Sequence, residues 1–213
     1  MTELVFILDR SGSMSGMEQD TVGGFNSMIR KQKQQEGAAL VSTVLFNNHC
    51  TVLHDRVPLE QVQPMTEAEY CACGTTALLD AVGGAIKHIG MVHKYARPED
   101  RPEKTLFVIT TDGLENASRK YTYDRVRKMI EHEKTEYGWE FLFLGANIDA
   151  AREAERFGIE ADRTADYHCD KQGMALNYEA IGDVVADVRA CRAVASNWKA
   201  RIDADYQTRG KKL

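Results

Sequence analysis

Three short segments place oxygen-bearing side chains at the ends of predicted secondary-structure elements. The first and the third follow apolar runs, and the second precedes a helical stretch. In chain order, the segments are Asp9-Arg10-Ser11-Gly12-Ser13, Cys73-Gly74-Thr75-Thr76 and Thr110-Thr111-Asp112-Gly113. The carboxylates of Asp9 and Asp112, together with the hydroxyls, make an all-oxygen set, which suits a hard cation such as Mg²⁺. Two negative charges are few for such an ion, so Mg²⁺ is expected to retain water in its shell.

Short apolar runs alternate with longer helical stretches along the chain. We expect strands over residues 4–8, 39–46, 50–57, 105–110, 139–144 and 163–169, and helices over 17–35, 76–95, 123–136 and 149–157. The alternation indicates an α/β fold: a doubly wound, mostly parallel six-stranded sheet with helices on both faces, Rossmann-like in type. The turn Asn47-Asn48-His49 predicts one antiparallel strand near an edge. In such sheets ligand sites lie outside the carboxyl ends of the strands, so the polar segments are expected to meet there.

The remainder of the chain predicts one long C-terminal helix. Apolar residues recur at steps of three and four from about position 172 onward. We therefore divide the chain into a domain core, 1–170, and a C-terminal helix, 171–213, whose first half covers the sheet. The part beyond about Val194 is expected to overhang the domain, which makes self-association through this helix possible.

Composition excludes some classes of function. The chain has 213 residues and a net charge of −5, which argues against nucleic acid as a partner because phosphate binding needs a concentrated basic surface. No apolar run approaches the roughly 18 residues of a membrane span. The start of the chain lacks the basic and apolar pattern of a signal peptide, so we expect a cytoplasmic protein.

The cysteines do not form a recognisable framework. There are five, and Cys71 and Cys73 are the one close pair. Their spacing does not fit a zinc half-site, and no second half follows. We interpret them as two reduced thiols on a loop.

Taken together, Asp-x-Ser-x-Ser after an apolar strand, Gly-Thr-Thr before a helix and Thr-Asp-Gly at another strand end resemble the metal-ion-dependent adhesion site of von Willebrand factor A (vWA) domains. The order of motifs matches from Val5 to at least Leu144. The resemblance implies five site residues, namely Asp9, Ser11, Ser13, Thr76 and Asp112. It implies that the two serines are direct ligands, that Asp9 acts through coordinated water, and that Asp112 ligates directly or through water. Thr76 fits the threonine role, with Thr75 as the alternative.

What the resemblance implies about function is binding rather than catalysis. The expected module binds a protein whose Asp or Glu carboxylate completes the shell of Mg²⁺, with Mn²⁺ or Ca²⁺ as substitutes. Because the chain shows no export signal, it is more similar to intracellular bacterial or phage members than to the exported adhesive ones.

The alternative is a metal-assisted phosphohydrolase or phosphotransferase with Asp9 as nucleophile. That chemistry usually has a second acid two residues on, where this chain has Ser11, and a lysine near the third segment, which is missing beside Asp112. No histidine occurs in the three segments, so neither serine has an evident base.

Four further polar residues each leave two interpretations open. Glu115 and Asn116 either rim the site or bind a second ion, or they belong to a capping loop. Asp149 is either a ligand or a helix N-terminal acid. Arg10 either influences which anion approaches or is simply solvated.

Overall fold

The computed structural model describes residues 1–210, which form one six-stranded sheet with helices on both faces. The strands are β1 (Thr2–Asp9), β2 (Ala39–Phe46), β3 (Cys50–Pro58), β4 (Lys104–Thr111), β5 (Glu140–Ala146) and β6 (Thr164–Tyr167). Their order is β3-β2-β1-β4-β5-β6. All neighbours are parallel except β2 and β3, which are antiparallel. The predicted fold class, including the antiparallel edge strand, is confirmed.

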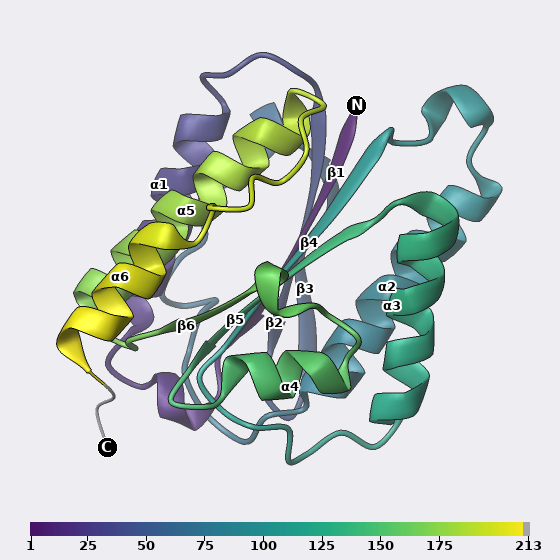
Figure 1. The fold of residues 1–213 in the computed structure, drawn as a ribbon. Coiled ribbons are helices and arrows are strands. Elements are labelled where there is room, and N and C mark those ends of the chain that lie inside the picture. The colour runs from purple at the N-terminus through teal and green to yellow at the C-terminus, as the bar shows by residue number, and fades with distance from the viewer. Residues whose placement is uncertain (211–213) are drawn as a thin grey trace.

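The helices form two layers. They are α1 (Glu18–Gln32), α2 (Leu78–Tyr95), α3 (Tyr123–Tyr137), α4 (Ala150–Arg156), α5 (Lys171–Arg189) and α6 (Ala200–Arg209). Short 3₁₀ turns are η1 (Gly12–Met14), η2 (Leu59–Gln61), η3 (Pro98–Asp100) and η4 (Ala161–Arg163). Helices α1, α5 and α6 lie on one side of the sheet, and α2, α3 and α4 lie on the other (Figure 1).

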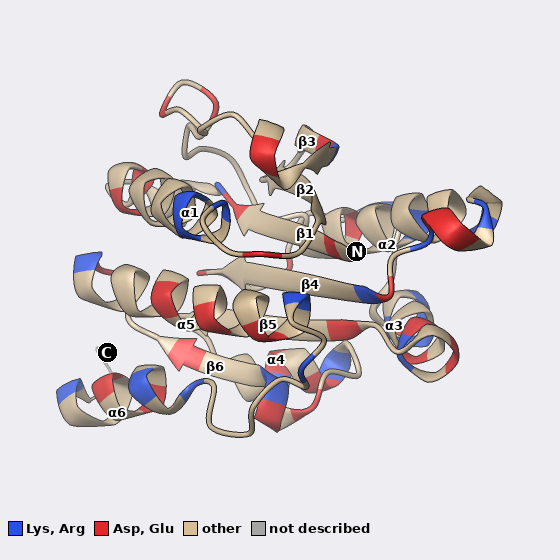
Figure 2. Cartoon of the chain, turned by 90° about the horizontal axis from the view of Figure 1, so that it is seen from above, with Lys and Arg blue, Asp and Glu red and all other residues tan. Residues whose placement is uncertain are grey.

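Strand β1 shows why both layers are needed. Successive side chains of a strand point to opposite faces. Leu4, Phe6 and Leu8 belong to the core under α1 and α5, whereas Val5 and Ile7 belong to the core under α2 and α3. Every residue of β1 is buried. Charged residues lie mainly on helices and loops while the strands are largely uncharged (Figure 2), as expected for a sheet covered on both faces.

The prediction of a single C-terminal helix is wrong, because the structure has two helices there. Helix α5 ends at Arg189, and α6 begins only at Ala200. Cys191 between them has a left-handed backbone, with a φ of 56°. The two helices contact one another, and α6 packs against β6. Of the predicted helix, residues 211–213 lie outside the described part.

Burial explains why the chain turns back. A continuous helix would carry its apolar stripe past the end of the sheet into water, whereas the turn returns Val194, Trp198 and Ile202 to the core under α5. The stripe repeats at helical spacing in both cases, so periodicity alone does not distinguish one helix from two. The overhang expected beyond Val194 is therefore also wrong, and these three residues are 8% exposed or less.

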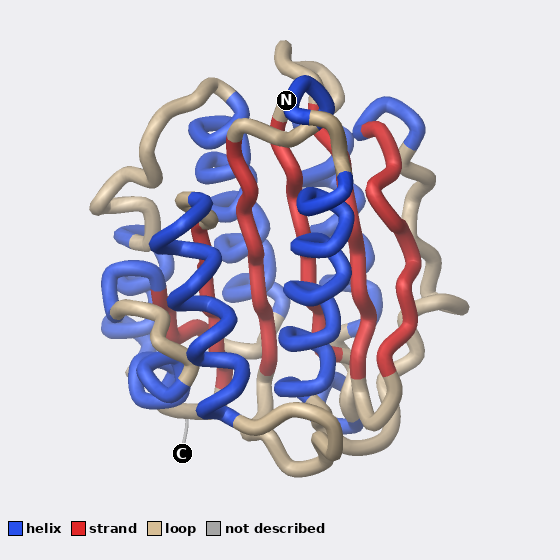
Figure 3. The backbone as a smooth tube through the Cα atoms, turned by 90° about the vertical axis from the view of Figure 1, so that its right-hand side faces the viewer, coloured by secondary structure: helices blue, strands red, loops and turns tan. Residues whose placement is uncertain are grey.

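The connections place one topological switch point in the sheet. From β1 the chain leaves through α1 to β2 on one side, and β4 lies on the other side of β1. The register pairs Leu8 with Thr110, so β1 and β4 end side by side. Figure 3 shows these parallel strands between the helices in front of and behind them. This crevice is where ligands bind in open α/β sheets.

None of the helices within residues 1–210 is both long enough and apolar enough to span a membrane.

Candidate metal centre

Asp9 is the last residue of β1 and lies in the crevice beside β4. Its Oδ1 accepts a hydrogen bond from the backbone N–H of Ser11 at 2.7 Å, which bends the loop sharply after the strand. Its Oδ2 accepts a hydrogen bond from the hydroxyl of Thr111 at 2.6 Å. Both oxygens are thus engaged from neighbouring strand ends, and Asp9 is only 2% exposed.

Asp112 approaches the same loop from the end of β4. The Ser13 hydroxyl donates a hydrogen bond to Asp112 Oδ1 at 2.6 Å. The Ser11 and Ser13 hydroxyl oxygens are 3.1 Å apart. A series of contacts therefore runs from Ser11 through Ser13 to Asp112, which is 99 positions from Ser13 in the sequence.

Thr76 completes the group from the segment before α2. A Cβ added to Gly113 would lie 3.3 Å from Thr76 Oγ1 and 3.7 Å from Ser13 Oγ, so both hydroxyls lie close to the backbone beside Asp112. Thr76 is buried, whereas Thr75 is exposed. The geometry favours Thr76 over Thr75 for the threonine role.

The second segment is held against the first by backbone contacts. The N–H of Gly12 donates to the carbonyl oxygen of Gly74 at 3.0 Å, and the N–H of Cys73 donates to that of Arg10 at 2.9 Å. Gly74 has a φ of +78°, and a Cβ there would meet the side chain of Asn48. The left-handed backbone at position 74 therefore favours glycine.

Burial without a counter-charge sets the electrostatics of the group. Desolvation raises the pKa of Asp112 to about 6, although the hydrogen bond from Ser13 opposes the shift and the nearby Asp9 carboxylate adds to it. Desolvation also raises the pKa of Asp9, against the hydrogen bonds from Thr111 and Ser11. Burial therefore disfavours the charged form of both acids, and a cation placed between them would favour it.

One oxygen of the group has no partner. Asp112 Oδ2 is buried and accepts no hydrogen bond from any residue in the described range. Buried carboxylate oxygens are normally paired, so an unpaired one calls for a ligand. A divalent cation fits this donor set, because it would neutralise two repelling acids and use oxygens throughout. Among the described residues there is no cluster of three or more His, Cys, Asp or Glu, so any ion here depends on the hydroxyls.

The structure also shows supporting residues that the motif did not reveal. The hydroxyls of Thr111 and Tyr70 donate to Asp9, the first to the carboxylate and the second to the backbone carbonyl. Thr111 belongs to the third segment, and its position next to Asp112 was the available signal. Tyr70 is fully buried and 61 positions from Asp9, with no local pattern to mark it.

The loop after Asp112 acts as a cap. Glu115 accepts hydrogen bonds from the N–H groups of Leu79, Ala117 and Ser118, which ties the loop to the start of α2. Asn116 Oδ1 accepts from the N–H of Thr76 at 2.9 Å. The capping interpretation holds for both residues, and Asn116 also positions Thr76.

Asp149 and Arg10 also receive structural roles. Asp149 is the N-cap of α4 and accepts from the N–H of Arg152. Arg10 donates to the hydroxyl of Thr51 at 2.7 Å and to the carbonyl oxygen of Glu69 at 2.9 Å. Its guanidinium therefore joins strand β3 to the segment around Glu69, so the side chain is not simply solvated.

The cysteines within residues 1–210 are unpaired, and Cys71 and Cys73 are both exposed. Burial, with Asp112, Asp170 and Asp9 nearby, raises the pKa of the Cys169 thiol to about 12. That thiol therefore remains protonated at neutral pH.

An open sheet of this order with hydroxyls and acids at the β1/β4 crevice defines the vWA fold, and comparison with solved structures agrees. No family model and no curated protein matches the sequence. The vWA protein of Catenulispora acidiphila superposes with a TM-score of 0.59 at 14% identity, covering 87% of this chain and 42% of that one. The vWA-type domain of the pilus tip protein Mfa5 of Porphyromonas gingivalis gives 0.59 at 9% identity, with 86% and 94% covered.

A third neighbour was solved with a metal ion bound. Proximal thread matrix protein 1 of the mussel byssus, solved with zinc in its metal-ion-dependent adhesion site, gives a TM-score of 0.58 at 13% identity. The alignment covers 87% of this chain and 46% of that protein, so this chain spans less than half of it. At these identities the comparisons establish the fold: the chain has the vWA fold.

Proposed function

We propose that this chain is a protein-binding module that depends on a divalent cation, most simply Mg²⁺. Ser11, Ser13 and Thr76 would hold the ion through hydroxyls, and Asp112 and Asp9 would supply the charge directly or through water. The observation that carries the proposal is the buried, unpartnered Oδ2 of Asp112 beside a second buried acid.

The choice of ion follows from the donors. Hydroxyls and carboxylates are hard ligands and suit Mg²⁺, with Mn²⁺ or Ca²⁺ as substitutes. An ion with two carboxylates for neighbours remains electrophilic and can bind a further oxygen ligand from another molecule. A partner's Asp or Glu carboxylate provides that oxygen.

The surface around the centre is suited to a macromolecular partner. Ser13 is exposed while Asp9 and Asp112 are buried, so access is from the side of the first loop. Leu114, two residues after Asp112, is 54% exposed and offers an apolar contact next to the centre. A polar centre with an apolar residue at its margin is a common composition for a contact surface.

A phosphotransfer role for Asp9 has less support in the geometry. Asp9 is 2% exposed, and both of its carboxylate oxygens already accept hydrogen bonds, so the approach of a phosphorus atom to this side chain is restricted. Hydrolysis of an aryl phosphate with Mg²⁺, measured for the wild type and Asp9→Asn, tests this. Turnover that the variant loses would support the enzyme and contradict the binding module.

The first experiment is a calorimetric titration with Mg²⁺ and Mn²⁺. We expect one ion to bind the wild type and none to bind Asp112→Asn, which keeps the size of the side chain. Asp124→Asn is the matched control, because Asp124 lies on the surface in an exposed pair with Lys128. No binding by the folded wild type, or equal binding by Asp112→Asn, would contradict the proposed centre.

The carboxylate preference is tested with the Mn²⁺-loaded protein. A glutamate-containing tripeptide with blocked ends is expected to lower the water-proton relaxation enhancement, because its carboxylate displaces a coordinated water. The corresponding glutamine peptide is expected to have no effect. If both peptides act equally, the ion does not select a carboxylate.

A further inference from the structure

A groove of about 530 Å³ lies between α2 and α3, far from the candidate metal centre. Thr105 at the start of β4 and Trp139 just before β5 line it, whereas the metal centre follows the opposite ends of the strands. The volume is in the range of small-molecule sites. Its position on the α2/α3 layer separates it from the α1/α5 layer on the other face of the sheet (Figure 1).

The base of the groove is apolar and aromatic. Trp139 is 5% exposed and stacks on Phe107, with ring centroids 5.3 Å apart, so its position is fixed by the core. Met91 and Met129 lie on the two helices that form the walls. Met91 is 45% exposed, so its side chain is open to a ligand in the groove. Methionine side chains adapt to ligands of different shape.

Gly90 creates the space over this base. A Cβ at position 90 would lie 3.3 Å from Glu133 Oε1 and 4.0 Å from Trp139 Cη2. Glycine is unfavourable inside a helix compared with alanine. At position 90 its missing side chain leaves the groove open above the indole ring of Trp139.

His93 forms a wall that is already ordered. Its Nε2 lies 3.2 Å from Oε2 of Glu3, which is completely buried, and its ring meets Trp139 edge-on at 5.4 Å. Arg56 holds the same Glu3 carboxylate at 2.8 Å. The hydrogen bond between His93 and Glu3 fixes the orientation of a ring that lines the groove.

The charges at the margin of the groove are mainly positive. Lys87, Lys94 and Arg101 line it against Glu103 and Glu133. Glu103 pairs with the Met1 amino group at 3.0 Å. Within residues 1–210 neither Lys87 nor Lys94 has an ion-pair partner. The two lysines are therefore available to an anion from outside.

We propose that this groove binds a small amphipathic carboxylate, whose apolar body covers Trp139 and the two methionines while its carboxylate lies near Lys87 and Lys94. Charge complementarity selects an anion, and the aromatic base selects an apolar body. This site is independent of the metal centre, and its test is unaffected if that centre fails.

The test uses three probes that differ only in the head group: octanoate, octylammonium and octanol. Trp139 reports binding directly in a Trp198→Phe background, because these are the only two tryptophans and Trp198 lies on the other side of the sheet. We expect a saturable change in Trp139 emission with octanoate, and binding about tenfold tighter than that of octylammonium. Calorimetry on the unmodified protein checks the affinity.

Matched glycine variants locate the site. Gly90→Leu fills the hollow and is expected to abolish octanoate binding. Gly84→Leu makes the same change on the same helix, where nothing lies within 4 Å of the added Cβ, and is expected to bind as the wild type does. Replacing Lys87 and Lys94 together by glutamine should weaken octanoate about tenfold and leave octanol unchanged.

Three outcomes would overturn the proposal. Octanoate binding that Gly90→Leu retains would place the site elsewhere. Tighter binding of octylammonium than of octanoate would reverse the charge selection. No binding of any probe by the folded wild type would exclude an amphipathic site in this groove.

Discussion

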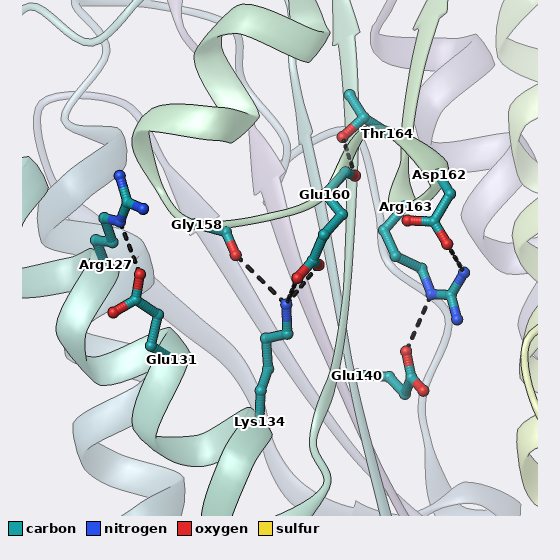
Figure 4. Close-up of polar contacts among 9 residues, drawn as sticks. All are labelled: Arg127, Glu131, Lys134, Glu140, Gly158, Glu160, Asp162, Arg163 and Thr164. Carbon is teal, nitrogen blue, oxygen red and sulfur yellow. Dashed lines mark hydrogen bonds and ion pairs between the residues drawn. The ribbon is translucent and has the colours of Figure 1, made fainter.

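Two polar clusters of this molecule differ in how their negative charges are balanced. In the first, around Asp112, two buried acids are surrounded by hydroxyls and backbone N–H groups. In the second, around Glu160, each carboxylate faces a cation (Figure 4). Lys134 donates to both oxygens of Glu160, and Arg163 pairs with Glu140 at 3.1 Å and with Asp162 at 2.8 Å.

The pKa values of the two clusters move in opposite directions. Burial alone would raise the pKa of Glu160, but Lys134, its hydrogen bonds and Arg163 together hold it below its ordinary value. At Asp112 desolvation prevails and raises the pKa to about 6. The carboxylates around Glu160 are paired with cations of the chain itself. Within residues 1–210 no Lys, Arg or His forms an ion pair with Asp112 or Asp9, and we infer that a cation from solution supplies the positive charge.

The largest expected effect is the pH dependence of the metal-free protein. Because the folded pKa of Asp112 is about 6, above its ordinary 3.8, protonation stabilises the fold, and this contribution is lost as pH rises from about 4 through about 6. The loss is on the order of 3 kcal/mol. Urea unfolding in metal-free buffers should show it as a difference between the wild type and Asp112→Asn, whose metal-free form is the more stable at pH 7.

Glu160 supplies the opposite sign for that experiment. Its pKa is lowered, so its contribution is present above its ordinary pKa of 4.5 and is lost as pH falls below it. The free energy of unfolding of Glu160→Gln should differ from that of the wild type mainly at neutral pH. That of Asp112→Asn should approach the wild-type value in acid. If the free energy of unfolding changes with pH in the same way in all three proteins, the two clusters do not differ in this respect.

The second effect is stabilisation by Mg²⁺. At 100 times its dissociation constant, an ion that binds only the folded state adds about 2.7 kcal/mol. For a chain of this size that raises Tm by roughly 5–10 °C. Calorimetric scans should show the increase for the wild type and for Lys134→Met, but not for Asp112→Asn. An equal increase in Asp112→Asn would place the ion elsewhere.

A smaller effect separates the two adjacent threonines. Thr76→Val removes a hydroxyl beside Ser13 and should weaken Mg²⁺ binding about tenfold, which corresponds to about 1.4 kcal/mol. Thr75→Val makes the same change at an exposed position and should leave the affinity unchanged. Calorimetric titration of both variants measures it, and the reverse order would assign the role to Thr75.

The smallest effect is expected where charges are already paired. Lys134→Met breaks the contact with Glu160, whose side chain is 62% exposed, and should cost less than about 1 kcal/mol. Chemical unfolding at low and at high salt measures it, because screening reduces the contribution of an exposed pair. A larger loss would mean that this cluster is also a centre of stability.

Much of the fold was predictable because local patterning reports burial. The all-apolar run after Glu3 indicated a central strand, and β1 is buried throughout. The turn at 47–49 indicated the antiparallel pair, which is β2 with β3. The C-terminal helix was not predictable as two helices, since Val194, Trp198 and Ile202 keep helical spacing across the turn that returns them to the core.

The sequence by itself determined the α/β alternation and the order of three polar segments along the chain. These are one-dimensional properties, because each depends on residues within a few positions of one another. Only the tertiary structure placed Asp9 beside Asp112, buried Thr76 rather than Thr75, and left one oxygen of Asp112 without a partner. Those features depend on β4 lying next to β1 and on the segment before α2 lying beside the ends of both strands. Packing between segments far apart in the sequence therefore decided them.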